Sequence, residues 1–251
     1  MSRGIKYKKF LEGKTVAVVG PSKTATMQEN GAKIEACDVV VRLNNMLEVE
    51  QEYKKYLGNR TDVVYATLDD PPHVMAQACV RNKVKYLSSS YPKNEWFFQE
   101  RMARNVAALK TIPYFSTVTL PEDPYWEIKR STNSRPNTGF SAIIDLLSSD
   151  LKELYIVGID FYRSAALEGG QGYYDGYDAG KWTDIRKQDF IKAWAQYDGP
   201  DRHDPDSAFR YFKHNMYLKD DRIVVDPIFE AFLKDEKYED LANLFVDCRL
   251  V

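Results

Sequence analysis

Residues Thr15–Ser22 read TVAVVGPS, a short and mostly β-branched run followed at once by a glycine-proline turn. An apolar run of this length bounded by turn residues is typical of a strand buried on both faces. In open parallel sheets, ligands bind beyond the carboxyl ends of the strands, where the amides of a tight turn meet phosphates. We therefore place Gly20, Pro21 and Ser22 at a candidate ligand site. Without GxGxxG or P-loop spacing, an ordinary strand-to-helix turn is the local alternative.

The same pattern recurs along the chain. Further strands are predicted at residues 38–42, 62–65, 84–87, 154–158 and 222–225. Helices are predicted at residues 72–82, 94–109 and 138–147, and from Pro205 and Pro227 onward. Short β-branched runs that alternate with helical stretches indicate an α/β fold, a mostly parallel sheet flanked by helices. One Rossmann-like domain over residues 1–251 is the simplest organisation.

The pattern changes between Arg163 and Asp204. Six glycines and several tyrosines interrupt this polar stretch, and no helical or strand period is sustained. Long segments of this kind within compact domains are usually functional lids or disordered. We predict an inserted lid at about residues 163–204.

Composition excludes several classes of protein. The net charge of −2 and the lack of a long basic stripe argue against nucleic acid as the main partner. No segment approaches the ~18 apolar residues of a membrane helix, and the basic N-terminus lacks the apolar core of a signal peptide. The three cysteines are far apart and form no CxxC pair, which argues against a disulfide framework or a zinc site. We expect a soluble, cytoplasmic protein with no membrane span; its oligomeric state is left open.

Two polar motifs stand at predicted element ends. Asn44 follows the strand at 38–42, and its amide suits a ribose or a phosphate, but local reasoning favours turn formation there. Residues 135–140 read RPNTGF, and Thr138 and Gly139 begin the next helix. The amides and hydroxyl there suit an anion or a nucleobase, and an ordinary N-cap is the alternative.

A histidine precedes a late helix. Asp204 is the predicted N-cap and Pro205 the first helical residue, so His203 lies just outside the helix N-terminus. The helix dipole favours a neutral imidazole, whereas Asp201, Asp204 and Asp206 favour the cation. The protonation state therefore stays open at this stage, and a surface histidine without a role is the plain alternative.

Taken together, these motifs resemble the animal-type sialyltransferases of glycosyltransferase family 29. The large sialylmotif corresponds to residues 16–22, 34–44 and 57–62, and the small one to residues 136–140 and 155–158. The second half is also similar to the bacterial sialyltransferases of family 42, where GIDFY at 158–162 has a near-identical counterpart. His203 falls where both families keep a histidine. Family 29 usually has asparagine where this chain has Pro21.

The resemblance implies an inverting, metal-independent glycosyltransferase with a variant of the GT-A arrangement. The donor would be a CMP-sugar, by default CMP-sialic acid, and the acceptor a glycan or glycolipid; no metal and no other cofactor are implied. His203 would be the base, and Tyr162 with Tyr173 or Tyr174 would stabilise charge on the leaving phosphate. Donor-binding residues would be Gly20, Pro21, Ser22, Asn44, Arg135, Asn137, Thr138, Gly139, Gly158 and Asp160.

Three other functions remain open from the sequence. A transferase that uses CMP-Kdo would need much the same nucleotide pocket. A catalytically inactive module that binds CMP or a glycan is a second alternative. A dinucleotide-dependent oxidoreductase would use the same kind of sheet, but its glycine fingerprint is absent.

Overall fold

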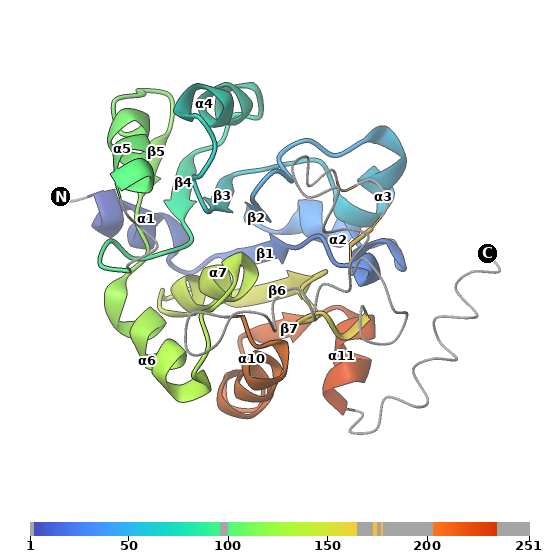
Figure 1. Ribbon diagram of the computed structural model, residues 1–251. Coiled ribbons are helices and arrows are strands. Elements are labelled where there is room, and N and C mark those ends of the chain that lie inside the picture. The colour runs from blue at the N-terminus through green and yellow to red at the C-terminus, as the bar shows by residue number, and fades with distance from the viewer. Residues whose placement is uncertain (1–2, 96–99, 165–172, 175–176, 178–202, 235–251) are drawn as a thin grey trace.

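A parallel sheet of seven strands forms the centre of the structure, a computed structural model that describes residues 3–95, 100–164, 173–174, 177 and 203–234 (Figure 1). The strands are β1 (Thr15–Val19), β2 (Val39–Leu43), β3 (Val63–Ala66), β4 (Tyr86–Ser89), β5 (Ser116–Val118), β6 (Glu153–Val157) and β7 (Ile223–Val225). Every neighbouring pair is parallel, in the order β5-β4-β3-β2-β1-β6-β7. The predicted α/β fold is confirmed.

The strand order reverses at β1. The chain builds β2 to β5 on one side of β1 and then returns to add β6 and β7 on the other side. Such a reversal leaves a crevice beyond the carboxyl ends of the two strands that flank it, because their connections run in opposite directions. The turns that follow β1 and β6 therefore frame the natural ligand position in this sheet.

Helices cover both faces of the sheet (Figure 1). The α-helices are α1 (Arg3–Leu11), α2 (Gly31–Ala36), α3 (Lys54–Leu57), α4 (Pro72–Arg81), α5 (Glu100–Leu109), α6 (Glu122–Thr132), α7 (Thr138–Leu147), α10 (Pro205–Tyr211) and α11 (Pro227–Lys234). Two 3-10 turns, η1 (Lys23–Thr26) and η2 (Gln51–Tyr53), and a π-helical turn, η6 (Phe212–Tyr217), complete the described elements.

Two buried tyrosines identify the covering helices. Tyr65 of β3 donates a hydrogen bond to Asp145 of α7 (2.7 Å), and its hydroxyl also lies 2.8 Å from that of Tyr7 in α1. Tyr155 of β6 donates to Asn30 (2.8 Å), the residue before α2. The strand register puts Tyr65 and Tyr155 on opposite faces, because side chains alternate along each strand. Helices α1 and α7 therefore share one face, and α2 lies on the other.

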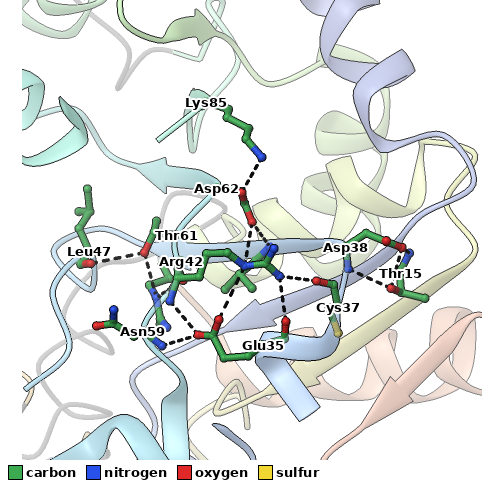
Figure 2. Close-up of polar contacts among 12 residues, drawn as sticks. Thr15, Glu35, Cys37, Asp38, Arg42, Leu47, Asn59, Thr61, Asp62 and Lys85 are labelled. Carbon is green, nitrogen blue, oxygen red and sulfur yellow. Dashed lines mark hydrogen bonds and ion pairs between the residues drawn. The ribbon is translucent and has the colours of Figure 1, made fainter. Parts of the chain in front are cut away.

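Carboxylates hold the amino-terminal ends of four strands in register (Figure 2). Asp38, before β2, accepts hydrogen bonds from the amide and the hydroxyl of Thr15, both at 2.9 Å. Asp62, before β3, accepts from the Val40 amide (2.9 Å) and pairs with Lys85, before β4 (2.8 Å). Hydrogen bonds to an ionised acceptor are stronger than neutral ones, so this edge fixes the relative heights of the strands.

The structure shifts two predicted boundaries. Strand β4 begins at Tyr86 because the Val84 amide instead donates to Cys79 and closes the turn after α4 (2.9 Å). Helix α5 begins at Glu100 among the described residues, although the predicted helix began at residue 94. Glu95 lies in a bend, where its buried carboxylate accepts from Tyr125 and Lys129. The helices α1, α2, α3 and α6 and the strand β5 had no predicted counterpart.

Most of the predicted lid lies outside the described residues. Of residues 163–204, the structure describes Arg163, Ser164, Tyr173, Tyr174, Tyr177, His203 and Asp204. The lid and the single-domain organisation therefore stay predictions. Within the described part of the chain, no helix is both long enough and apolar enough to cross a membrane.

Strands β1 and β6 are joined backbone to backbone just past their ends. The Gly20 amide donates to Val157 (2.8 Å), and the Ser22 amide donates to Gly158 (2.9 Å). A Cβ on Gly20 would overlap the Gly158 carbonyl oxygen. Gly158 has φ +65°, and a Cβ there would lie 2.5 Å from both the Gly20 oxygen and the Ala25 Cβ. Only glycine allows this approach, since any side chain would force the two turns apart.

We predict that Gly158→Ala lowers the free energy of unfolding by about 3 kcal/mol or more, because left-handed strain adds to a steric overlap. Gly13→Ala is the matched control: Gly13 has φ +68°, but a Cβ there meets nothing within 4 Å. That variant should lose only about 1 kcal/mol from backbone strain. Urea unfolding of both variants checks this, and equal losses would show that the contact between the turns is not tight.

Candidate active site

The turn after β6 is built around the buried Asp160. Its Oδ1 accepts from the Tyr162 amide (2.9 Å), and its Oδ2 accepts from the hydroxyls of Ser164 (2.5 Å) and Ser22 (2.7 Å). Phe161 and Tyr162 have φ +51° and +62°, a left-handed conformation that is costly without glycine. The hydrogen bonds of Asp160 hold these two residues in place, and such enforced strain is common at functional sites.

The turn after β1 is joined to two tyrosines of the predicted lid. Ser22 forms an antiparallel bridge with Tyr173, and the Tyr174 amide donates to the Pro21 carbonyl (3.1 Å). The Gly20 and Ser22 amides donate to β6 and its turn. The turn after β1 is thus hydrogen-bonded on one side to β6 and its turn, and on the other side to Tyr173 and Tyr174. The donor-binding role of Gly20, Pro21 and Ser22 stays a prediction.

The structure separates the two candidate tyrosines. Tyr173 lies beside Tyr162, with ring centroids 6.3 Å apart and the two hydroxyls hydrogen-bonded. Tyr174 instead packs on Tyr53, with centroids 5.0 Å apart, and burial raises its pKa to about 12. Burial also raises the pKa of Tyr162 well above its ordinary value, so this hydroxyl keeps its proton as a donor. Tyr173 is therefore the partner of Tyr162.

Asn137 connects the start of α7 with Tyr162. Its side-chain oxygen accepts from the Phe140 amide (2.9 Å) as the N-cap, and its Nδ2 lies 3.4 Å from the Tyr162 hydroxyl. A Cβ on Gly139 would lie 3.3 Å from side-chain atoms of both Leu43 and Ile159. The small residue therefore lets α7 begin close against the ends of β2 and β6. The ordinary N-cap, which the sequence left as the alternative, is thus present with Asn137 as the capping residue, and the same side chain also reaches the neighbouring turn. The donor-binding role of this segment stays a prediction.

Two hydrogen bonds position His203, one from its own ring and one from the backbone of the next residue. Its Nδ1 lies 2.6 Å from the Arg135 carbonyl oxygen, and the Asp204 amide donates to the Ser134 hydroxyl (2.7 Å). A carbonyl can only accept, so Nδ1 must carry the proton of this hydrogen bond. In the neutral ring the basic lone pair is then on Nε2. This is the tautomer that a general base with Nε2 as its acceptor requires.

Burial and, to a smaller extent, the positive charge of Arg135 lower the pKa of His203 from 6.5 to about 4, although the hydrogen bond to the Arg135 carbonyl raises it. Of the three aspartates considered from the sequence, Asp201 lies outside the described residues, and the other two have partners of their own. The Asp204 carboxylate caps α10 through the amides of Asp206 and Ser207, both at 3.1 Å, and the Asp206 carboxylate pairs with Arg163 (2.6 Å). The imidazole is therefore neutral at neutral pH, which answers the question that the sequence left open.

Four predicted site residues line one pocket at the carboxyl edge of the sheet: Arg135, Asn137, Tyr162 and His203. The other lining residues are Ser134, Phe161, Asp204, Pro205 and Ala208. Sequence reasoning assigned no site role to these five. Ser134 directly precedes the RPNTGF motif and Phe161 lies within GIDFY, so both were within reach of the motif argument. No signal in the sequence marks Ala208.

The remaining predicted residues lie outside this pocket. Asn44 adopts φ +49°, its side-chain oxygen accepts from the Thr67 amide (3.3 Å) and its own amide donates to Tyr65 (2.7 Å). This geometry fits the turn-forming interpretation. Thr138 is buried at the start of α7, next to Gly139. Within the described ranges, no three His, Cys, Asp or Glu side chains gather where they could hold a metal ion.

Comparison with known proteins shows similarity to sialyltransferases. Residues 7–112 match glycosyltransferase family 29 (sialyltransferase). The structure is similar to the sialyltransferase CstII from Campylobacter jejuni in complex with cytidine-5'-monophosphate, with TM-score 0.50 and 14% identity over 85% of this chain and 80% of that chain. A variant of Cst-II in complex with CMP gives TM-score 0.51 and 16% identity over 80% and 78%. A mammalian sialyltransferase gives TM-score 0.47 and 14% identity over 87% and 71%. No curated protein matches the sequence.

The family match covers less than half of the chain, and the solved structures show that the chain shares its fold with sialyltransferases. The matched residues include the turn after β1 and the Asn44 turn. The small sialylmotif, Tyr162 and His203 lie beyond them. The family match therefore does not extend to those residues.

The low pKa of His203 predicts a pH dependence of stability. Because the folded-state pKa of about 4 lies below the ordinary 6.5, the unfolded chain takes up this proton first as the pH falls. From about pH 7 to about pH 5, the wild type should lose about 2 kcal/mol of stability relative to His203→Ala. Urea unfolding at both pH values measures this. A constant difference between the two proteins would mean that the ring is normally solvated.

Proposed function

We propose that this protein transfers sialic acid, or a related acidic sugar, from a CMP-sugar to a hydroxyl of a glycan or glycolipid. The observation that carries the proposal is the hydrogen bond from His203 Nδ1 to the Arg135 carbonyl, which makes Nε2 the basic atom of the ring. The pocket that His203 shares with Asn137 and Tyr162 supports a reaction at this point. The CMP held by the similar Campylobacter structure supports cytidine as the nucleotide.

The proposed reaction is a single displacement with inversion. The acceptor oxygen attacks the anomeric carbon as the bond from that carbon to the phosphate oxygen breaks. CMP leaves with the electron pair, and the proton of the acceptor hydroxyl passes to Nε2 of His203. A base that receives this proton in the transition state lowers the barrier most when it is already neutral and correctly oriented.

The leaving phosphate needs hydrogen-bond donors where its charge develops. Tyr162 and Tyr173 are the best candidates, because their hydroxyls lie together and burial raises the pKa of both. They therefore remain neutral donors at the pH of the reaction. The leaving CMP carries less charge than a nucleoside diphosphate, which reduces the need for a metal ion. We accordingly propose metal-independent transfer.

Donor binding would also strengthen the base. A pKa of about 4 makes the imidazole a weak proton acceptor while the pocket holds no anion. The phosphate and carboxylate of a CMP-linked acidic sugar would favour the imidazolium and raise that pKa, opposite in sign to the effect of Arg135. In this proposal, His203 becomes an effective base only after the donor has bound.

Other parts of the proposal rest on less direct support. Asn44, Thr138 and Gly139 are proposed contacts for cytidine, because all three lie at strand exits or helix starts along the same sheet edge. A cytoplasmic location is proposed from the cysteines, of which Cys37 and Cys79 are free and buried. The choice between sialic acid and Kdo depends on sugar contacts, and a screen of both donors decides it.

Replacing His203 with alanine tests the mechanism. We expect kcat for transfer to fall by ~10²–10⁴, the usual loss for a general base, while the Kd for CMP changes little. His73→Ala and His214→Ala are the matched controls, because both side chains are exposed and lie outside the pocket. They should keep nearly full activity.

The same assay, run in EDTA, tests metal independence. Activity that disappears in EDTA and returns with manganese would contradict the proposed leaving-group chemistry. Full transfer by a folded His203→Ala variant would reject His203 as the base. Binding of CMP without any transfer or donor hydrolysis would instead identify an inactive binding module.

Nucleotide selectivity gives an independent prediction. A ligand that binds only the folded state raises Tm, and the shift grows with its affinity. We expect CMP to raise Tm more than UMP, GMP or AMP at the same concentration. Thermal unfolding with each nucleotide measures this. Equal shifts with CMP and UMP would reject a cytidine pocket, and a shift with NADH alone would indicate an oxidoreductase.

A further inference from the structure

Arg163 reaches from the turn after β6 to the start of α10. Its Nη1 pairs with the Asp206 carboxylate (2.6 Å), and its Nη2 donates to the Pro205 carbonyl (3.2 Å). The guanidinium carbon lies 4.4 Å from the centre of the Phe209 ring. The Arg163 side chain is only 10% exposed, so its bond to the Pro205 carbonyl and its contact with Phe209 form in a largely desolvated setting. Charge-assisted hydrogen bonds are stronger there than on the surface. The Asp206 carboxylate is 65% exposed, so water screens the ion pair more than the other two contacts.

The backbone of Arg163 lies next to Tyr162, and its side chain contacts the segment that follows His203. At the backbone end, the Arg163 amide donates to Asp160 (3.1 Å), within the strained turn that carries Tyr162. At the side-chain end, its partner Pro205 lies two residues after His203. The Arg163 side chain therefore connects the turn of Tyr162, the proposed hydrogen-bond donor to the leaving phosphate, with the segment of His203, the proposed base.

The arginine side chain is suited to hold two segments at a fixed distance from each other. Arginine presents a planar fork that donates in two fixed directions, here to a carboxylate and to a backbone carbonyl, and its face covers an aromatic ring. Lysine carries the charge but has no fork, so it cannot reproduce both bonds and the stacking. Arg163 does not line the pocket itself, so direct contact with a substrate is not required of it.

We propose that Arg163 is a positioning residue that sets the spacing of His203 and Tyr162. The inference rests on the proposed function, in which those two side chains share one reaction. Arg163 acts through α10: when its fork is lost, the segment of His203 keeps its ties to Ser134 and Arg135 but loses this polar link to the Tyr162 turn. The packing of Phe161 on Phe209, with centroids 6.2 Å apart, remains but does not fix the direction of a hydrogen bond.

The test uses six variants of the full chain: the four that follow, His203→Ala, and Arg163→Met combined with His203→Ala. Arg163→Met keeps most of the stem and removes the fork, and Arg163→Lys keeps the charge. Asp206→Asn removes one partner at an exposed position, where folding is not at risk. Arg222→Met is the matched control: Arg222 also bonds an aspartate and a backbone carbonyl, but it lies just before β7, at the opposite edge of the sheet.

The kinetic readout is the division between kcat and binding. We expect Arg163→Met to lower kcat by about 10- to 100-fold, since displacements of about 1 Å have effects of this size. The Kd for CMP should stay within about threefold, Arg163→Lys should recover part of kcat, and Asp206→Asn should lose less than Arg163→Met. Adding Arg163→Met to His203→Ala should cost little more than His203→Ala alone. An unchanged kcat, or losses that multiply in the double variant, would overturn the proposal.

The second readout does not depend on activity. The chain has three histidines, so His203→Ala identifies the NMR signals of the His203 ring. In Arg163→Met, the pKa of this ring should rise as the segment loosens and the imidazole gains water, whereas Arg222→Met should leave it unchanged. An unaltered pKa and tautomer in Arg163→Met and Asp206→Asn would overturn the proposal. If no CMP-sugar supports transfer, the proposed function fails; if His203→Ala is fully active, only the role of His203 as the base fails. In both cases the NMR result still decides whether Arg163 positions the ring.

Discussion

The close approach of Gly20 and Gly158 is the constraint on which the site depends. At this point β1 and β6 continue their pairing past the strand ends, through the Gly20 and Ser22 amides. The space between them excludes even a methyl group. Since the sheet reverses its order between these strands, the contact also fixes the two turns at the reversal. Asp160 then links the turns through Ser22, and the strained Tyr162 depends on that link.

The site is assembled from segments far apart in the sequence. The turn after β6 supplies Tyr162, the start of α7 supplies Asn137, and the start of α10 supplies His203. Backbone and capping groups carry the connections: the Arg135 carbonyl accepts from His203, and the Ser134 hydroxyl accepts from the Asp204 amide. The capping and backbone groups are occupied in positioning these segments. The imidazole Nε2 and the tyrosine hydroxyls are the groups with the chemistry to act on a substrate.

The sequence predicted the sheet well because its signals are local. Runs such as TVAVV carry their own period and composition, and the glycine after each of β1 and β6 marks a turn that only glycine can make. The misplaced start of α5 had another cause. Glu95 reads as part of a helix, but its carboxylate is buried against Tyr125 and Lys129, more than 25 residues away. A contact at that separation leaves no periodic signal. The choice between Tyr173 and Tyr174 likewise needed three dimensions.

The protonation state of His203 could not be predicted from its neighbours in the sequence. Within the RHDPD segment, the two carboxylates that follow the histidine argue for an imidazolium. In the folded chain, the Asp204 carboxylate accepts hydrogen bonds from the amides at the start of α10, and the Asp206 carboxylate forms an ion pair with Arg163. Burial and Arg135 then set the pKa. The effect of a neighbouring charge therefore depends on what that charge already binds, and Arg163, which looks unremarkable in the sequence, helps decide the state of the ring.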